Sequence, residues 1–384
     1  MRKWFKILLL VHSFALLSGC WNREELPEKA FVMGLAINKA EPNKVKIMVQ
    51  LFKPSQKTAG KGEAGNSFTN LESTGASAFE AVRDITLRLG RKAQWGHTRI
   101  IIIDEQTAMR NDLLSLLELF YRDHETRITT KVVIAKEDSA NLLKEKPMIE
   151  LTSSQQINRM EEIANRVAGK VPDMTLLKLA RDLKSEAGNS ILPLISKSSS
   201  NEMMLIGSAA IHHGLFAGAL NSRQTQDLLM LTNQFRSGSV KVPCKTKEND
   251  KERKYESLEV QSVHTVMKPI LASDSLRVTY KIKVQGDIAE LQCTRLNTSI
   301  SETAYVHYIE TLLQKRLLDT IKFTQTKEMD LLGIGNTLYR KHTRTWKQWK
   351  PDWDKHYAEA KFDVKVTVHI DNSLTTVGKP LYKQ

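Results

Sequence analysis

The first half of the chain alternates between strand-like and helix-like patterns of apolar residues. From Val45 to Phe52 every second residue is apolar up to Leu51, which is typical of a strand with one buried face. From Ser77 to Leu89 the apolar residues, Phe79 among them, instead recur at helical spacing, and Gly90 follows where a glycine would end a helix. Strands and helices that alternate in this way predict a sheet covered by helices.

The same two patterns continue as far as Leu183. Further strands are expected at Ala30–Ile37, Arg99–Ile103 and Lys131–Ala135, and further helices at Asn111–Arg122, Asp138–Lys144, Ser153–Val167 and Met174–Leu183. Pro54–Asn70 is polar and lacks periodicity, so a mobile loop or a hairpin extension is expected there. Its Gly60–Gly65 segment fits the letters of a dinucleotide-binding fingerprint, but the helix that this fingerprint requires does not follow the glycines.

The polar stretch Ser196–Asn201 resembles a linker and precedes a second half with longer strands. A hairpin is expected from Met203–His213 and Leu215–Leu220, an antiparallel meander from Ser237–Lys245, Leu258–Met267 and Leu276–Leu291, helices at Ser222–Asn233, Ile300–Phe323 and Asn336–Lys347, and a last strand at Phe362–Ile370. The chain is therefore expected to be a multi-domain α+β protein with mixed and antiparallel sheets covered by helices. The expected parts are a signal peptide at 1–19, an N-terminal α+β region at 20–200 that could hold two domains, and a C-terminal α+β domain at 201–384.

The first twenty residues carry the pattern of a lipoprotein signal peptide. Basic residues precede an apolar run from Ile7 to Leu17, which is too short to span about 30 Å of hydrocarbon. Ser18 and Gly19 then leave room for the enzymes that act at Cys20. We expect residues 1–19 to be removed and Cys20 to carry a diacylglycerol and an N-acyl lipid. The alternative is an ordinary secretory signal or a buried first strand with a chance cysteine.

The chain is strongly basic, with a formal net charge of +14 over 384 residues. Loss of Arg2, Lys3 and Lys6 with the signal peptide lowers this charge by three, to +11. For an anchored chain the nearest anions are lipid head groups, where each nearby cation contributes about 1 kcal/mol. Nucleic acid is not expected as a partner, because the export signal removes the chain from that compartment.

No sequence motif indicates catalytic or metal-binding chemistry. The ten histidines form no HExxH pattern, and a C-x2-C pair, a G-x-S-x-G elbow and a P-loop are all absent from the sequence. His212 and His213 are neighbours in a predicted strand, so their rings are expected on opposite faces. We therefore expect neither an enzyme nor a metal site. Cys244 and Cys293 could pair in an exported protein or remain as two free thiols.

Trp346, Trp349 and Trp353 stand among lysines near the C-terminus. Aromatic and cationic side chains together suit a membrane interface or a protein partner, so these three residues form a candidate interface. The alternative is that the rings close the core against the last strand.

The residues that follow the lipidation site carry a further motif. Cys20 runs directly into Trp21, and Arg23, Glu24 and Leu26 follow. This start resembles the mature N-terminus of the Ger(x)C spore germination lipoproteins, although Asn22 stands where that family usually has aspartate. Other stretches look like the family in the expected order along the chain: Gly96-His97-Thr98 leading into Arg99, Gly207–Ile211, Asp330–Gly335, and the tryptophan-rich stretch before Phe362–Ile370.

The resemblance implies the C subunit of a nutrient germinant receptor, anchored in the outer leaflet of the spore inner membrane. It implies two integral membrane subunits and membrane lipid as partners, three α+β domains, no catalytic residues and no cofactor beyond the lipid on Cys20. The leading hypothesis is therefore a lipid-anchored subunit that acts in assembly and signalling of spore germination, with Trp21 to Leu26 next to the membrane. The alternative is a solute-binding lipoprotein that captures a small nutrient directly.

Overall fold

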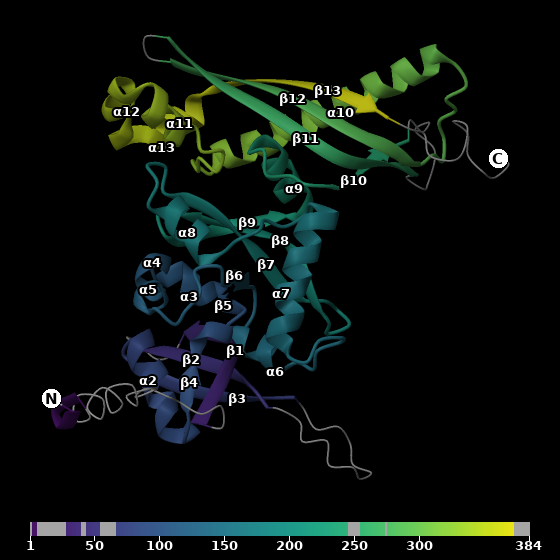
Figure 1. Cartoon of the computed structure of the whole chain (residues 1–384). Helices are drawn as coiled ribbons and strands as arrows, with labels where there is room; N and C mark the ends of the chain where they lie inside the picture. The colour runs from purple at the N-terminus through teal and green to yellow at the C-terminus, as the bar shows by residue number, and fades with distance from the viewer. Residues whose placement is uncertain are drawn as a thin grey trace, which may run out of the picture.

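The computed structural model contains two sheets, one above the other, with helices packed against them (Figure 1). The structure describes residues 2–5, 28–39, 44–53, 67–244, 254–272 and 275–371. Cys20, Trp21 to Leu26 and the Gly60–Gly65 segment lie outside these residues. The expected α+β class, with mixed and antiparallel sheets covered by helices, is confirmed.

The first sheet has nine strands, in the order β3-β2-β1-β5-β6-β7-β8-β9, with β4 beside β1. Its centre is parallel, from β1 through β5 and β6 to β7, and antiparallel hairpins extend both edges. The strands are β1 (Lys29–Lys39), β2 (Val45–Phe52), β3 (Phe68–Gly75), β4 (Lys92–Gln94), β5 (Ile100–Asp104), β6 (Lys131–Ala135), β7 (Asn189–Lys197), β8 (Met203–His212) and β9 (Leu215–Asn221).

Helices cover both faces of this sheet, which explains why β5 is apolar at every position from Ile100 to Ile103. Ile101 and Ile103 pack in one cluster, and Ile100 and Ile102 pack in the other. The first face carries α2 (Ala78–Leu89), α3 (Glu105–Arg110), α4 (Leu113–Leu116), α5 (Glu118–Arg122) and α8 (Leu176–Leu183). The second face carries α6 (Ser139–Lys144) and α7 (Ser153–Ile163), which continues into the π-turn η3 (Ala164–Ala168).

Helix α2 shows how local sequence fixes an element. Ser77 caps its first turn by accepting a hydrogen bond from the backbone N–H of Glu80, and the Glu80 carboxylate accepts in return from the N–H of Ala76. Gly90 ends the helix in the left-handed conformation, with φ at 61°. The helix that the sequence predicts at Ser77–Leu89 is therefore present.

The polar stretch around Ser196–Asn201 lies between two adjacent strands of the first sheet. β7 runs to Lys197, β8 starts at Met203, and the two strands pair antiparallel. The sheet thus continues across residues 200 and 201. The division of the chain into domains at 200 and 201 stays a prediction.

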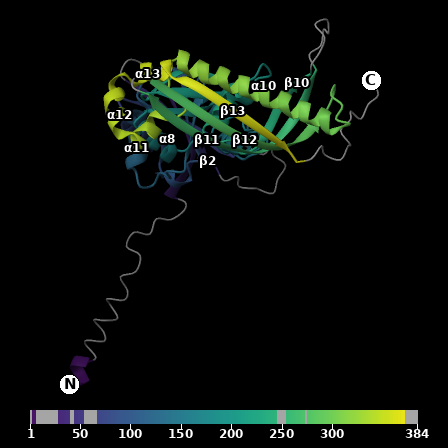
Figure 2. The same cartoon turned by 90° about the horizontal axis from the view of Figure 1, so that it is seen from above.

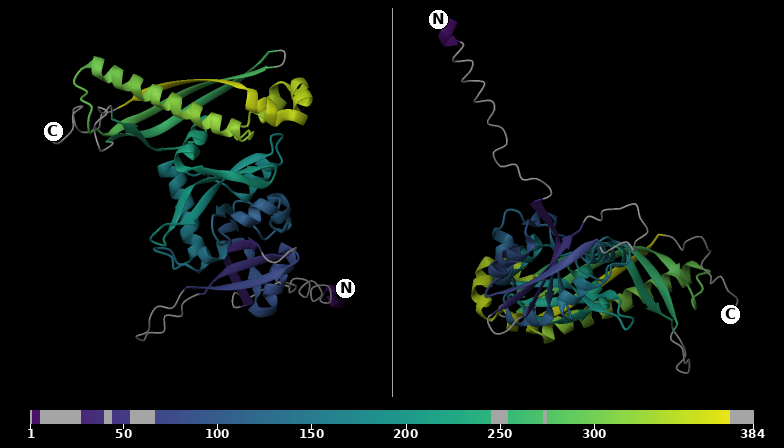
Figure 3. Two further views of the ribbon diagram at one scale, coloured as in Figure 1. Left: turned by 180° about the vertical axis from the view of Figure 1, so that it is seen from behind. Right: turned by 90° about the horizontal axis from the view of Figure 1, so that it is seen from below.

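The second sheet has four strands, in the order β10-β11-β12-β13. β10 (Gly238–Pro243), β11 (Tyr255–Ala272) and β12 (Ser275–Glu290) form the predicted antiparallel meander, and β13 (Lys361–Ile370) adds in parallel to β12. The long helix α10 (Ser299–Thr326) covers one face of this sheet (Figure 2). Seen from behind, α10 lies in front of the strands (Figure 3). On the opposite face of the sheet, alternate residues of β12 and β13 are exposed, so no described element covers them there.

A disulfide joins the ends of two strands of the second sheet. Cys244 follows β10 and Cys293 follows β12, and their Cα atoms are 6.1 Å apart. The pairing that the sequence left open is thus present in the structure, where it ties two segments 49 residues apart in sequence.

Helix α9 (Ser222–Leu231) lies between the two sheets, and every residue from Thr225 to Leu231 is buried. The Arg316 guanidinium of α10 donates to the Asp227 carboxylate and to the Gln226 side chain, and Thr320 donates to Asp227 at 2.8 Å. Burial raises the pKa of the Asp227 carboxyl to about 6, an increase that Arg316 and Thr320 oppose. The ion pair therefore links α9 to α10 inside the core.

Replacing Arg316 with methionine is expected to lower the free energy of unfolding by about 3–5 kcal/mol, because Asp227 stays buried and loses its cation. Urea unfolding of the purified protein measures this change. Arg344→Met, at an exposed position of α12 (Thr343–Trp349), is the control and should change stability by less than about 0.5 kcal/mol. Equal effects of the two substitutions would contradict a role of the buried pair in holding the helices together.

Candidate functional site

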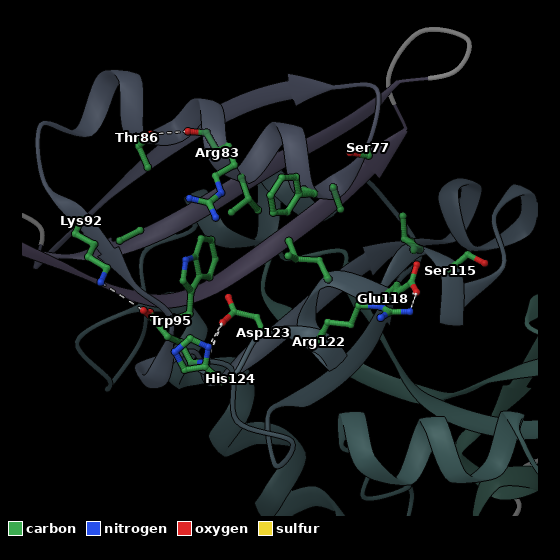
Figure 4. A pocket seen from close by; sticks show the side chains of 17 residues that line it. Ser77, Arg83, Thr86, Lys92, Trp95, Ser115, Glu118, Arg122, Asp123 and His124 are labelled. Carbon is green, nitrogen blue, oxygen red and sulfur yellow. Dashed lines mark hydrogen bonds and ion pairs between the residues drawn. The ribbon is translucent and has the colours of Figure 1, made fainter.

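A groove of about 720 Å³ opens between α2 and the α4–α5 pair (Figure 4). We call it the α2 groove. Buried apolar side chains line its floor, among them Trp95 from the turn η2 (Trp95–His97), Val82 from α2 and Leu116 from α4. Phe79, one of the apolar residues at helical spacing in α2, is 52% exposed at this groove.

Charges of both signs surround the apolar floor of the α2 groove (Figure 4). Arg122 pairs with Glu118 at 2.8 Å, and Lys92 lies 3.8 Å from Glu125. Arg83 lies over the Phe79 ring, 5.1 Å from its centroid. A small solute with an ammonium group, a carboxylate and an apolar side chain would find a complementary group for each part. The sequence alone did not reveal the groove, because its lining comes from three separate segments of the chain.

The three tryptophans of the candidate interface are buried in the core of the second half. Trp346 is 1% exposed, Trp349 is 7% exposed and Trp353 is 5% exposed. The rings of Trp346 and Trp353 pack edge to face, with centroids 5.2 Å apart. The structure therefore corrects the interface prediction for these residues: their rings close the core, the alternative that the sequence had left open.

The tryptophans are fixed by the Asp330–Gly335 stretch that the sequence singled out. Asp330 is fully buried and accepts hydrogen bonds from the N–H groups of Ile334 and Gly335, at 3.0 and 2.7 Å, at the start of α11 (Ile334–Lys341). Trp353 donates to the same carboxylate at 3.3 Å. Burial raises the pKa of Asp330, while these donors oppose the increase. A Cβ atom on Gly335 would lie 2.9 Å from the Trp346 ring, so only glycine fits there.

The Gly207–Ile211 stretch also serves the fold. Gly207 has φ at 138°, and a Cβ atom there would lie 2.1 Å from the Leu220 carbonyl oxygen. The hydroxyls of Ser208 and Thr225 are hydrogen-bonded at 2.8 Å, which joins β8 to α9. These residues therefore position backbone and helices instead of lining the α2 groove.

His212 and His213 do not point to opposite faces, so that prediction was wrong. Their ring centroids are 4.1 Å apart, and both rings approach Asp354 of α13 (Trp353–Glu359). The alternation fails because β8 ends at His212, and His213 turns with φ at 48°. Two further histidines pack on aromatic rings: His97 against Phe31, with centroids 4.9 Å apart, and His356 on Trp349.

The lipidation site is not among the described residues. Cys20 and the motif of Trp21, Arg23, Glu24 and Leu26 remain predictions from the sequence. Among the described helices, none has the length and apolar character needed to cross a membrane.

Comparison with known proteins assigns the two halves of the chain to one class, the spore germination proteins. Residues 22–197 match the family described as "Spore germination protein N-terminal domain", and residues 206–374 match "Spore germination B3/ GerAC like, C-terminal". The chain belongs to the Ger(x)C family of spore germination proteins.

Two relatives from Bacillus subtilis (strain 168) span nearly the whole chain. Spore germination protein KC is 25% identical over 402 residues, which cover 96% of this chain and 95% of that protein. Spore germination protein B3 is 24% identical, covering 94% of this chain and 96% of that protein. The crystal structure of the GerBC protein shares the fold, with a TM-score of 0.58 at 18% identity, covering 91% of this chain and 100% of that one.

Replacing Trp346 with alanine tests its role in the core. The variant is expected to lose about 3–5 kcal/mol of stability in urea unfolding, because a large ring packed against Trp353 leaves a cavity. Tyr339→Ala, at a position 46% exposed, is the control and should cost much less. If Trp346→Ala kept its stability but lost binding to lipid vesicles, the interface interpretation would be restored.

Proposed function

We propose that this chain is a lipid-anchored subunit of a nutrient germinant receptor at the spore inner membrane, acting in receptor assembly and signalling. The observation that carries the proposal is the position of the family match. It begins at residue 22, two residues after Cys20, and both domains together continue to residue 374. The family match therefore starts where the predicted lipoprotein signal ends.

Basic side chains on the exposed face of the second sheet support the proposal that this face lies next to anionic lipid head groups. Lys281 and Lys283 of β12 and Lys365 of β13 are exposed on this face, where Arg277 pairs with Asp363 at 3.0 Å. Lys281 and Lys365 lie directly opposite each other in the sheet register. Like charges in that arrangement lower stability in water, and anionic phospholipid head groups would offset the repulsion. Basic charge is also the second signal that a single lipid anchor needs for stable membrane binding.

Two integral membrane subunits complete the proposed receptor. The proposal of these two partners rests on family membership together with the predicted lipid anchor. Affinity purification from spore membranes should recover two multi-span proteins with this chain. Recovery of the chain alone would argue against assembly and favour a solute-binding lipoprotein.

Replacing Cys20 with alanine is expected to abolish incorporation of radioactive fatty acid, because the thiol that accepts the diacylglycerol is gone. The variant should also leave the membrane fraction and weaken nutrient-triggered germination. Cys244→Ser is the control, since it removes a different cysteine and should keep full lipid labelling. Wild-type labelling of the Cys20→Ala protein would refute the anchor.

The α2 groove supports the second candidate function, capture of a small nutrient by this chain itself. Calorimetry with a panel of amino acids and sugars is the test, and sub-millimolar binding of one of them is expected if this function holds. Arg83→Ala should then weaken binding at least tenfold, through loss of a charged group at the groove. Arg159→Ala, an exposed arginine outside the groove lining, is the control. If no compound of the panel binds, the nutrient-capture function is rejected and the receptor-subunit function is the one that remains.

A further inference from the structure

Three potential metal ligands meet where the two halves of the protein touch. His212 ends β8, His213 starts the turn into β9, and Asp354 comes from α13 of the second half. Their ligand atoms all lie within 4.8 Å of one another. The Asp354 Oδ2 atom is 3.4 Å from His212 Nε2 and 3.7 Å from His213 Nε2. We name these residues the His-His-Asp cluster.

The distances in the cluster match the edges of a metal coordination shell. Zinc binds imidazole nitrogen and carboxylate oxygen at about 2.0–2.2 Å, so two ligands of a tetrahedral site are about 3.4 Å apart. Direct N–H···O hydrogen bonds are shorter, at about 2.7–3.2 Å. The two nitrogen–oxygen distances therefore suit an ion held between the atoms better than direct hydrogen bonds.

A chain of hydrogen bonds orients His212 for metal binding. The Asn189 amide nitrogen donates to the Asp330 carbonyl at 3.2 Å, which turns the Asn189 oxygen toward the ring. That oxygen lies 2.7 Å from His212 Nδ1, and as an acceptor it favours the tautomer with the proton on Nδ1, which donates to it. The Nε2 lone pair is then directed at the cluster, in the arrangement by which outer residues usually fix a metal-binding histidine.

The backbone of His213 is held in a strained conformation that brings its ring to the same place. Its φ of 48° is unusual for a residue other than glycine, and its N–H donates to the Gly188 carbonyl at 3.1 Å. The His213 side chain is 63% exposed, so solvent reaches the cluster and can supply a fourth ligand. The cluster thus has three protein ligands and an open position.

We infer that the His-His-Asp cluster binds a divalent transition-metal ion of the zinc type and that the ion clamps the two halves together. Two imidazoles select Zn²⁺, Co²⁺ or Ni²⁺ over Mg²⁺ and Ca²⁺, which prefer oxygen ligands. The clamp would reinforce contacts that already exist around it. Ala187 donates to Asn336 at 3.0 Å, and Glu186 accepts from Trp346 at 2.9 Å.

Zinc titration of the purified full chain tests the inference. The protein is stripped with chelator and kept free of reductant, so that Cys244 and Cys293 stay bonded to each other and offer no thiolate. Calorimetry should show one Zn²⁺ per chain, Co²⁺ should give the visible absorption of a low-symmetry site, and Mg²⁺ should not bind. The melting temperature should rise by a few degrees with Zn²⁺ about 100-fold above Kd.

Matched variants separate the cluster from other sites. Asp354→Asn keeps the shape of the side chain and should weaken Zn²⁺ binding at least tenfold and remove the rise in melting temperature. Asn189→Leu should weaken binding by about 10–100-fold through the orientation of His212. His124→Ala, a histidine 95% exposed on the surface, should leave binding unchanged. The inference is overturned if the wild type takes up no Zn²⁺ or if Asp354→Asn binds it as tightly as the wild type.

Discussion

The placement of the two sheets depends on one buried helix, α9, whose polar side chains need hydrogen-bond partners on several sides. Thr225, Gln226 and Asp227 of α9 are all buried, and each reaches a different neighbour: Ser208 of β8, the Ser239 carbonyl of β10 and Arg316 of α10. A buried polar group without its partner costs more than an apolar one, so these bonds allow α9 few alternative positions. Because the first two partners belong to different sheets, the same helix fixes how the sheets face each other.

A second contact between the halves lies around α11, α12 and α13 and depends on Asp330. Its carboxylate starts α11 and holds Trp353, while its backbone carbonyl accepts from Asn189 of β7. One residue therefore connects the packing of the tryptophans with the orientation of Asn189 and, through it, of His212. The His-His-Asp cluster needs both contacts, because its ligands come from β8, the following turn and α13. A shift of either half would separate Asp354 from the histidines.

The spacing of apolar residues predicted the helices and strands whose buried side chains are apolar. It missed strands whose buried residues are polar or whose pattern is interrupted. The sequence predicted strand β2 and helix α2. It missed strand β3, because β3 contacts the buried Gln50 through a polar residue, Asn70, and therefore lacks a clear apolar pattern. Strand β7 was missed although its inward residues are apolar, because Pro193 interrupts the run and the linker-like polar sequence starts at Ser196 within the strand. The candidate site was harder to predict. The convergence of His212, His213 and Asp354 follows from a strand end and from a contact that is distant in sequence. The proposed lipid site at Cys20 depends instead on recognition by processing enzymes.

The stretches that carry the family resemblance act inside the fold, which limits what family membership says about function. Asp330 and Gly335 start a helix and make room for tryptophan rings, and Gly207 and Ser208 fit β8 against its neighbours. None of these residues lines the α2 groove. A relative can therefore keep the fold with different charged side chains at the groove rim, because the buried floor of the groove belongs to the core and the rim does not. Under the proposed receptor function, the identity of the nutrient therefore has to be sought in the groove chemistry or in a proposed partner subunit, whereas the family motifs account for the shared framework.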